Sequence, residues 1–135
     1  DIARAHVFGA TVTKVMTANS DTLTIWGTGE EKRDLLHVSD IVLAIEAAIE
    51  KQQTSFELYN IGLGRAIAIK DLVQKIIDIS GKYLNIEYDL TKPSNKTSLC
   101  LDYSKAQHEL NWEPRVELED GIRQTIKWYI KNILP

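Results

Sequence analysis

Apolar residues recur along this chain with two distinct periods. Spacings of three and four residues predict helices over 39–51, 71–80, 104–110 and 118–132, and a looser stripe predicts a helix over 2–17. Alternating and β-branched residues predict strands over 22–26, 35–38, 56–61, 84–88 and 98–101. Four to five helices interleaved with short strands predict an α/β fold.

Two of these helices carry recognisable end signals. The hydroxyl of Ser39 can accept a hydrogen bond from a free backbone N–H, so Ser39 is predicted to cap the helix that follows it. Asp40 falls in the first turn of that helix, where a negative charge suits the helix dipole. Gly81 can adopt the left-handed conformation that ends many helices, so it is predicted to close the helix over 71–80.

Composition narrows the class of protein. A chain of 135 residues with 44% hydrophobic residues predicts one globular domain, spanning 1–135. A net charge of −3 without basic runs predicts neither a nucleic-acid partner nor a membrane. Cys100 is the only cysteine, which predicts a reducing, cytoplasmic location, and its neighbours Leu99 and Leu101 predict a buried thiol. Because the chain begins with Asp1, we expect it to be a fragment of something longer.

Three blocks of residues follow one another at the spacing of single helices and strands. They are Trp26-Gly27-Thr28-Gly29 with Arg33-Asp34-Leu35-Leu36-His37-Val38-Ser39-Asp40, then Tyr59-Asn60-Ile61-Gly62-Leu63-Gly64, then Leu101-Asp102-Tyr103-Ser104-Lys105-Ala106 with Leu110-Asn111-Trp112-Glu113-Pro114. In this order the blocks resemble the C-terminal half of the extended short-chain dehydrogenase/reductases, the NAD-dependent nucleotide-sugar epimerase/dehydratase family. The resemblance covers nearly the whole chain and implies the nucleotide-sugar-binding portion of such an enzyme, without its N-terminal Rossmann domain.

The resemblance implies that Arg33 contacts the diphosphate of a nucleotide-sugar. A guanidinium fork suits that task, because it can make two charge-assisted hydrogen bonds to phosphate. The alternative is a solvated loop arginine paired with Asp34, Glu30 or Glu31.

A second phosphate contact is implied at Lys92 and Asn95, where many relatives carry Arg-Pro-Gly-Asp. Lysine offers only a point charge, so bidentate binding is lost there. The Lys-Pro form resembles the GDP-fucose synthase branch of the family. The alternative is a surface turn.

The nucleotide base is implied to lie near Thr24, Trp26 and Ile69. Thr24 and Trp26 match a strand that, in UDP-galactose 4-epimerase relatives, reads the base through backbone groups beside an aromatic ring. The alternative for Trp26 is a core tryptophan, and the alternative for Ile69 is core packing.

Several apparent motifs are excluded by their surroundings. Tyr88 and Lys92 have the spacing of the family's catalytic pair, but the segment reads as a strand and Pro93 follows at once. The glycine pairs in 27–29 and 62–64 lack the third glycine of a dinucleotide fingerprint. Ser39, His37 and Asp40 cannot form a triad at one strand–helix junction, and the histidines lack metal-ligand spacing. We therefore predict no catalytic, cofactor-binding or metal residues here; NAD or NADP is expected only in the full-length parent.

The resemblance also implies that 35–51 and 56–62 normally pack against the missing Rossmann domain. Their apolar residues are then predicted to be exposed, at Ile41, Ile45, Ile49, Phe56, Leu58 and Tyr59. We expect a homo-oligomer or association with a Rossmann half, and weak nucleotide-sugar binding by the fragment. The alternative function is a truncated, stand-alone binding or interaction protein without catalytic activity.

Overall fold

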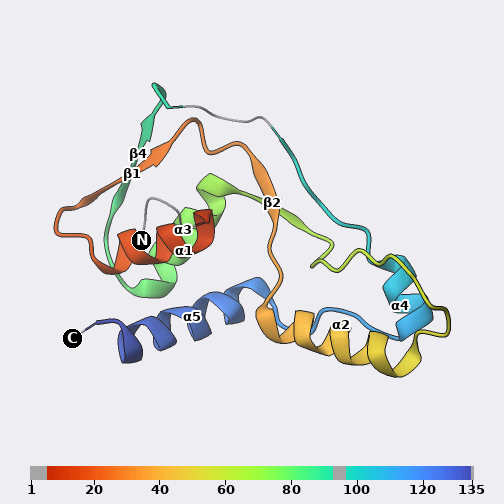
Figure 1. Ribbon diagram of the computed structural model, residues 1–135. Coiled ribbons are helices and arrows are strands. Elements are labelled where there is room, and N and C mark those ends of the chain that lie inside the picture. Colours follow the sequence, from red (N-terminus) through yellow and green to blue (C-terminus); the bar gives the residue numbers. More distant parts are fainter. Residues whose placement is uncertain (1–5, 93–96, 135) are drawn as a thin grey trace. The chain divides into compact units, whose positions relative to one another are not determined.

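The computed structural model describes residues 6–92 and 97–134 (Figure 1). Its elements are α1 (Val7–Met16), β1 (Thr22–Trp26), β2 (Lys32–Asp34), α2 (Val38–Lys51), β3 (Ala66–Ala68), α3 (Ile69–Ser80), β4 (Asn85–Asp89), α4 (Ser104–Leu110) and α5 (Leu118–Asn132). They divide into two compact units. The first unit holds the described residues of 1–31, 68–97 and 122–135, and the second unit holds those of 32–67 and 98–121.

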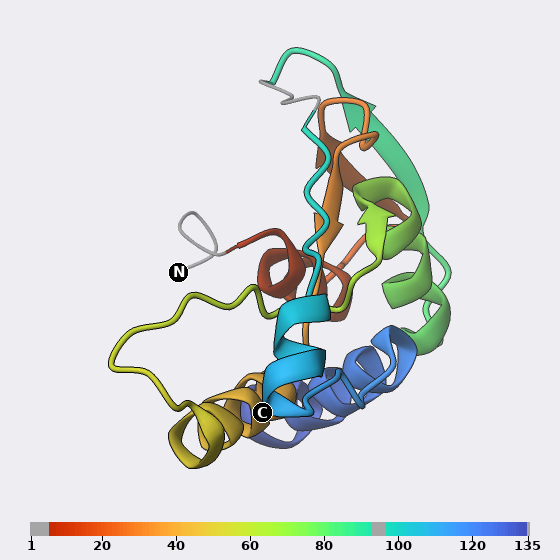
Figure 2. The same cartoon turned by 90° about the vertical axis from the view of Figure 1, so that its right-hand side faces the viewer.

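The first unit is built on two parallel strands. β1 and β4 pair in register from Thr22 opposite Asn85 to Trp26 opposite Asp89, and they run side by side in both ribbon views (Figures 1 and 2). Leu23 and Ile25 are buried, so the other face of β1 carries the exposed positions. Because the strands are parallel, both carboxyl ends lie at the same edge.

Helix α3 provides most of the apolar core of the first unit. It buries Leu72, Val73, Ile76 and Ile77 completely or nearly so, and it packs against α1. Full burial of such side chains contributes roughly 1.5–3 kcal/mol each relative to exposure. The helix ends at Gly81, whose φ of 73° is left-handed, as predicted.

The second unit is organised by the packing of α2 on α4. Its core contains Ala44, Ala106, Leu110 and Trp112, and the Trp112 ring meets Tyr103 edge-on with 5.8 Å between centroids. β2 pairs with β3, and Ser98 forms an isolated bridge to Lys32.

A buried carboxylate connects α2 to the segment that precedes α5. Asp40 is 1% exposed, and its Oδ2 accepts hydrogen bonds from the amides of Arg115 at 3.2 Å and Val116 at 3.0 Å. Its carbonyl oxygen accepts a third, from Nε1 of Trp112 at 3.0 Å. One residue in the first turn of α2 therefore ties down three positions of a distant loop.

The beginning of α2 differs from the prediction. The strand lies at Lys32–Asp34 and not at 35–38, and α2 starts at Val38. Ser39 is not the cap: Nδ1 of His37 accepts the Ser39 amide at 3.3 Å, and the Ser39 hydroxyl lies 2.8 Å from the same nitrogen. The ring of His37 thus satisfies a free amide of the first turn.

The prediction of a strand over 56–61 is also wrong, although the side chains of this segment alternate between exposed and half-buried as expected. Phe56 and Leu58 are exposed, whereas Glu57, Tyr59 and Ile61 are half-buried. Side chains hold it to α4, through a Glu57–Lys105 ion pair and a hydrogen bond from the Tyr59 hydroxyl to Glu109 at 3.0 Å. A strand needs a neighbour to pair with, and the described residues supply none here.

The segment over 98–101 is likewise not a strand beyond its bridge at Ser98. Cys100 is exposed, so the prediction of a buried thiol is wrong. Alternating neighbours indicated burial, but only Leu101 of this stretch is half-buried, while Leu99 is exposed.

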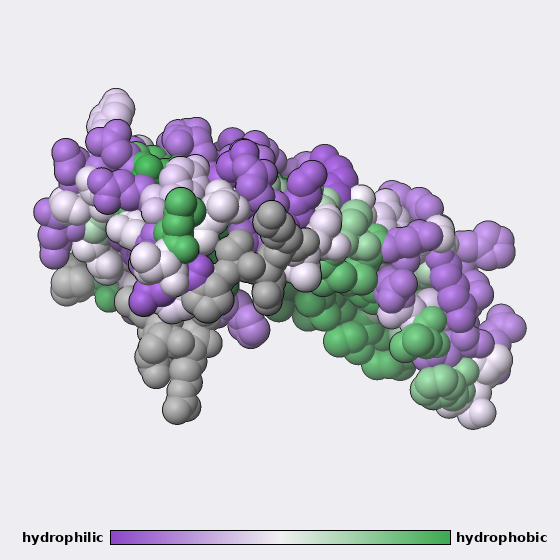
Figure 3. All heavy atoms as spheres, turned by 90° about the horizontal axis from the view of Figure 1, so that it is seen from above, coloured by the Kyte–Doolittle hydropathy of each residue, from purple (hydrophilic) through white to green (hydrophobic). Residues whose placement is uncertain are grey.

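An apolar surface remains open on the second unit. We define it by Ile41, Ile45 and Ile49 on α2 together with Phe56 and Leu58, all of which are exposed as predicted. Hydrophobic side chains gather over the part of the chain that contains α2 in the space-filling view (Figure 3). Tyr59 does not belong to this surface, because alternation turns it toward the core cluster.

Candidate functional site

An exposed tryptophan stands at the carboxyl end of β1. Trp26 is 61% exposed, so it is not the core tryptophan of the alternative interpretation. Nζ of Lys92 lies 5.8 Å from the centroid of the Trp26 ring, which is cation–π distance. The structure therefore brings together two of the residues predicted to bind nucleotide.

Asp89 shapes the turn that carries Lys92. Its carbonyl oxygen accepts the amides of Gly27 at 2.9 Å and Lys92 at 3.3 Å, which links the ends of both strands. Its Oδ1 accepts the hydroxyl of Thr91 at 2.6 Å and the amide of the same residue at 3.0 Å. These two hydrogen bonds lower the pKa of Asp89, and the bond from the Thr91 hydroxyl has the larger effect. Sequence reasoning missed this residue, although Asp-x-Thr is a typical side-chain-to-backbone turn.

Thr24 and Ile69 lie in the same unit but in different environments. Thr24 shares the exposed face of β1 with Trp26, and its carbonyl oxygen accepts Nζ of Lys14 at 3.4 Å. Ile69 begins α3 as a buried side chain, with its amide donating to the carbonyl of Glu31 at 3.0 Å. A role beside a base stays a prediction for both.

The glycines that follow Trp26 form a turn against α3. The carbonyl of Gly29 accepts the amide of Lys70 at 3.0 Å, and a Cβ on Gly29 would stand 3.0 Å from Cβ of Lys70. Nζ of Lys70 lies 2.6 Å from Glu30, whose hydrogen bond and charge raise the pKa of Lys70. The turn at Gly29 is thus packed closely against the start of α3.

Arg33 lies in the second unit and is half-buried. Its Nη1 donates to the carbonyl of Lys32 at 2.8 Å, next to it in β2. Asn95, the remaining predicted site residue, lies outside the described residues. Diphosphate contacts by Arg33, Lys92 and Asn95 stay predictions.

Asp34 is a second residue that sequence reasoning missed. Its carboxylate accepts three backbone amides, those of Leu63 at 2.7 Å and of Gly64 and Leu101 at 3.0 Å each. The donors come from the glycine turn and from the segment leading to α4. Asp34 therefore organises the backbone on the other side of β2 from Arg33.

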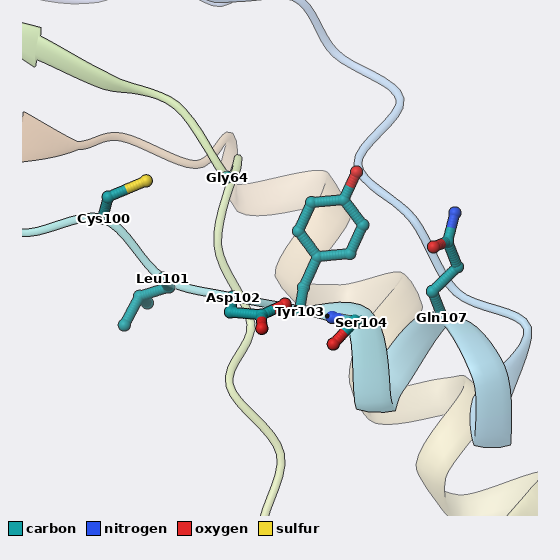
Figure 4. A pocket seen from close by; sticks show the side chains of 7 residues that line it. All are labelled: Gly64, Cys100, Leu101, Asp102, Tyr103, Ser104 and Gln107. Atoms are coloured by element: carbon teal, nitrogen blue, oxygen red, sulfur yellow. Dashed lines mark hydrogen bonds between the residues drawn. The ribbon is translucent and has the colours of Figure 1, made fainter.

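Next to these amide donors of Asp34, the second unit has an open cavity of about 420 Å³. Figure 4 shows its lining, which comes from the turn at Gly64, the segment before α4 and α4 itself; the residues are Gly64, Cys100, Leu101, Asp102, Tyr103, Ser104 and Gln107. Oδ1 of Asp102 accepts the amide of Ser104 at 2.9 Å, and this bond lowers the pKa of Asp102.

Tyr88 lies on β4 and Lys92 in the turn that follows it, so they do not share a helix. His37 meets Ser39, but the carboxylate of Asp40 is engaged by distant backbone amides. Within residues 6–92 and 97–134, no group of three or more His, Cys, Asp or Glu residues could hold a metal ion. No helix in the same ranges is long and apolar enough to cross a membrane.

The model of the family described as GDP-mannose 4,6 dehydratase matches residues 5–125 of this chain. The chain belongs to this family of NAD-dependent nucleotide-sugar epimerases and dehydratases. The resemblance drawn from the three motif blocks is therefore confirmed, and so is the α/β fold with five helices and few strands.

The relatives match nearly all of this chain, but the chain matches only part of each relative. The putative GDP-L-fucose synthase 2 of Arabidopsis thaliana is 32% identical, over 96% of this chain and 40% of its own length. A UDP-glucose 4-epimerase with UDP-glucose from Thermotoga maritima superposes with a TM-score of 0.87 at 30% identity, over 98% of this chain and 42% of its own. A dTDP-glucose 4,6-dehydratase of Bacillus anthracis in complex with NAD gives a TM-score of 0.78 at 28% identity, over 94% and 40%. The chain spans about two-fifths of the length of these proteins.

Proposed function

We propose that this chain is the nucleotide-sugar-binding portion of an NAD(P)-dependent sugar epimerase, dehydratase or reductase, and that it is not catalytic by itself. The observation that carries the proposal is the exposed Trp26 with Lys92 beside its ring, at the carboxyl ends of two parallel strands. In open α/β sheets, ligands bind outside the carboxyl ends of the strands. The proposed ligand contacts are Thr24, Trp26, Arg33, Ile69, Lys92 and Asn95.

An exposed aromatic ring with an adjacent ammonium group suits a nucleoside phosphate. A base can stack on the indole, as bases do on aromatic side chains in other proteins. The Lys92 ammonium is a point charge that attracts phosphate without demanding one geometry. Relatives that are about 30% identical over the matched part of their length include GDP-L-fucose synthases, so GDP is the first ligand to test.

The test compares two exposed tryptophans of the first unit. Trp26 is 61% exposed and Trp128, on α5, is 57% exposed, so both can be changed to alanine without opening a core. Calorimetric titration with GDP should lose at least about fivefold in affinity in Trp26→Ala, because stacking is worth roughly 1–3 kcal/mol. Trp128→Ala should bind as the unchanged chain does. Equal affinities in all three proteins would reject the proposed base contact.

The glycine pairs in 27–29 and 62–64 lack the third glycine of a dinucleotide fingerprint, so we propose no NAD site on them. A Cβ on Gly62 would lie 2.7 Å from Cβ of Leu101, and a Cβ on Gly29 would lie 3.0 Å from Cβ of Lys70, so both glycines are packed closely against neighbouring side chains. NAD or NADP would belong to the parent, where it would supply hydride transfer. Titration of this chain with NAD⁺ should accordingly release no heat, and micromolar affinity would contradict the proposal.

We propose that the apolar surface of the second unit packs against the Rossmann half of the parent. The surface joins the outer face of α2 to the alternating segment over 56–61, whose exposed face carries Phe56 and Leu58. Exposed apolar patches of this kind mark interaction sites. Alone, the chain is expected to cover the same surface with a second copy of itself.

Light scattering tests this association. The chain of 15.3 kDa should show at least twice that mass, and Ile45→Glu should reduce it toward the monomer. Ile130→Glu is the matched control, because Ile130 is 50% exposed on α5 and Ile45 is 55% exposed on α2. A monomer at high concentration would favour the alternative function, a stand-alone binding protein whose apolar surface needs neither a Rossmann half nor a second copy to cover it.

A further inference from the structure

Asp34 stands directly after Arg33 at the end of β2, and its carboxylate gathers three segments of the second unit. The amides of Leu63, Gly64 and Leu101 all donate to it at 2.7–3.0 Å. These donors are 29, 30 and 67 residues away along the chain.

The glycines near this carboxylate are packed so closely that neither has room for a side chain. A Cβ on Gly62 would lie 3.0 Å from Oδ2 of Asp34 and 2.7 Å from Cβ of Leu101. Gly64 has a left-handed φ of 72°, and a Cβ there would meet the Tyr103 ring at 2.7 Å. Glycine at both positions therefore lets the backbone approach the side chains of Asp34 and Tyr103 closely.

Adjacent residues of a strand project to opposite faces. A carboxylate held by three amides on one face of β2 therefore fixes the backbone from which Arg33 projects on the other. The hydrogen bonds also spread the negative charge of Asp34 over the dipoles of three peptide groups. A bound phosphate would thus meet less repulsion from this neighbouring carboxylate.

We propose that Asp34 is a positioning residue for the diphosphate contact of Arg33. This inference rests on the proposed function, because it presupposes that Arg33 binds phosphate. Asp34 does not touch the ligand; it holds β2 and the glycine turn so that the guanidinium fork points to the phosphates. Removing its charge loosens that support without removing the arginine.

The test uses the advantage of a diphosphate over its nucleoside, measured as the affinity ratio of GDP to guanosine by amide-shift titration of the 135-residue chain. The unchanged chain should favour GDP by about tenfold or more. Asp34→Asn places an amide N–H₂ group among amide donors, and it should reduce the ratio to about twofold while guanosine affinity stays the same. Asp102→Asn, a matched change in the same unit with a single amide donor, should keep the full ratio.

A double-mutant comparison separates positioning from general loss of structure. If Asp34 acts through Arg33, Arg33→Ala with Asp34→Asn should lower the ratio no further than Arg33→Ala alone. Asp34→Glu keeps both acceptor oxygens and should reduce the affinity ratio of GDP to guanosine by an intermediate amount. This variant replaces Asp34→Asn in the test if Asp34→Asn does not fold. A full ratio in folded Asp34→Asn, with loss in Arg33→Ala, would overturn the inference. No preference for GDP in the unchanged chain would instead overturn the proposed diphosphate contact.

Discussion

Replacing Asp40 by alanine should destabilise the second unit far more than the same change at Asp71. Both aspartates are the third residue of a helix, α2 and α3, so both interact with a helix dipole. Asp40 is 1% exposed and accepts two loop amides, whereas Asp71 is exposed. The pair therefore separates the buried hydrogen bonds from the effect that any first-turn carboxylate has.

The magnitude follows from those two bonds. Hydrogen bonds to a charged acceptor contribute about 1.5–3 kcal/mol each, and alanine would leave the amides of Arg115 and Val116 without it. Because the amides are adjacent and water can reach the enlarged site, we expect a total loss of about 2–4 kcal/mol. Asp71→Ala should cost less than about 1 kcal/mol, the usual size of a helix-dipole contribution.

Urea unfolding, followed by circular dichroism and by the tryptophan emission to which the buried Trp112 contributes, measures both losses. Trp112 is a suitable probe because its Nε1 donates to the carbonyl of Asp40. A difference between the two variants below about 0.5 kcal/mol would refute the assignment of Asp40 as the residue that ties α2 to the loop before α5.

Three further results are expected. His37→Ala should lose about 1 kcal/mol of unfolding free energy because the first turn of α2 loses its cap, while His37→Asn should keep most of it; equal losses in thermal unfolding would argue against capping by the ring. Gly9→Ala should stabilise α1 by about 0.5–1 kcal/mol, because nothing lies near its Cβ position, whereas Gly62→Ala should destabilise by over about 2 kcal/mol through its collision with Leu101; the reverse order in urea would contradict the packing at Asp34. The hydrogen bond from Lys105, followed by its charge, lowers the pKa of Glu57. The ion pair therefore stabilises the folded protein above the unfolded pKa of Glu57, and this stabilisation is lost as the pH falls through the lower folded pKa. Hydrogen exchange of residues 56–61 should become faster in that acid range, and Lys105→Met should remove this pH dependence.

The sequence was sufficient where a structure depends on local contacts. The helix over 118–132 was predicted with the bounds that α5 has, because its apolar residues recur at helical spacing. Gly81 closes α3 in the conformation expected of it. Both results need only residues within a few positions of one another.

Elements that depend on distant partners were predicted less well. The apolar pair Leu35 and Leu36 suggested a strand, but Leu36 packs on the core of the second unit from a loop, and the strand runs through the charged residues before it. The side chains over 56–61 alternate in burial, but their backbone is not paired with another strand among the described residues. A period of two describes which face is buried, and pairing requires a neighbouring strand.

The same distinction holds for the candidate site. Trp26 and Lys92 were selected by motif position, and the structure places them in cation–π contact. Asp34 was overlooked because its three donors lie 29 to 67 residues away, and a single sequence does not show which amides converge on a carboxylate. Asp40 was assigned only a helix-dipole role for the same reason.

The measurement that tests the central claim most directly is a map of amide shifts in the ¹⁵N-labelled chain on addition of GDP, UDP and dTDP. The proposed function predicts that shifts cluster at Thr24, Trp26, Arg33 and Lys92, and that they weaken in Arg33→Ala and Trp26→Ala. Shifts confined to other residues, such as those lining the cavity before α4, or no shifts at millimolar nucleotide, would contradict it.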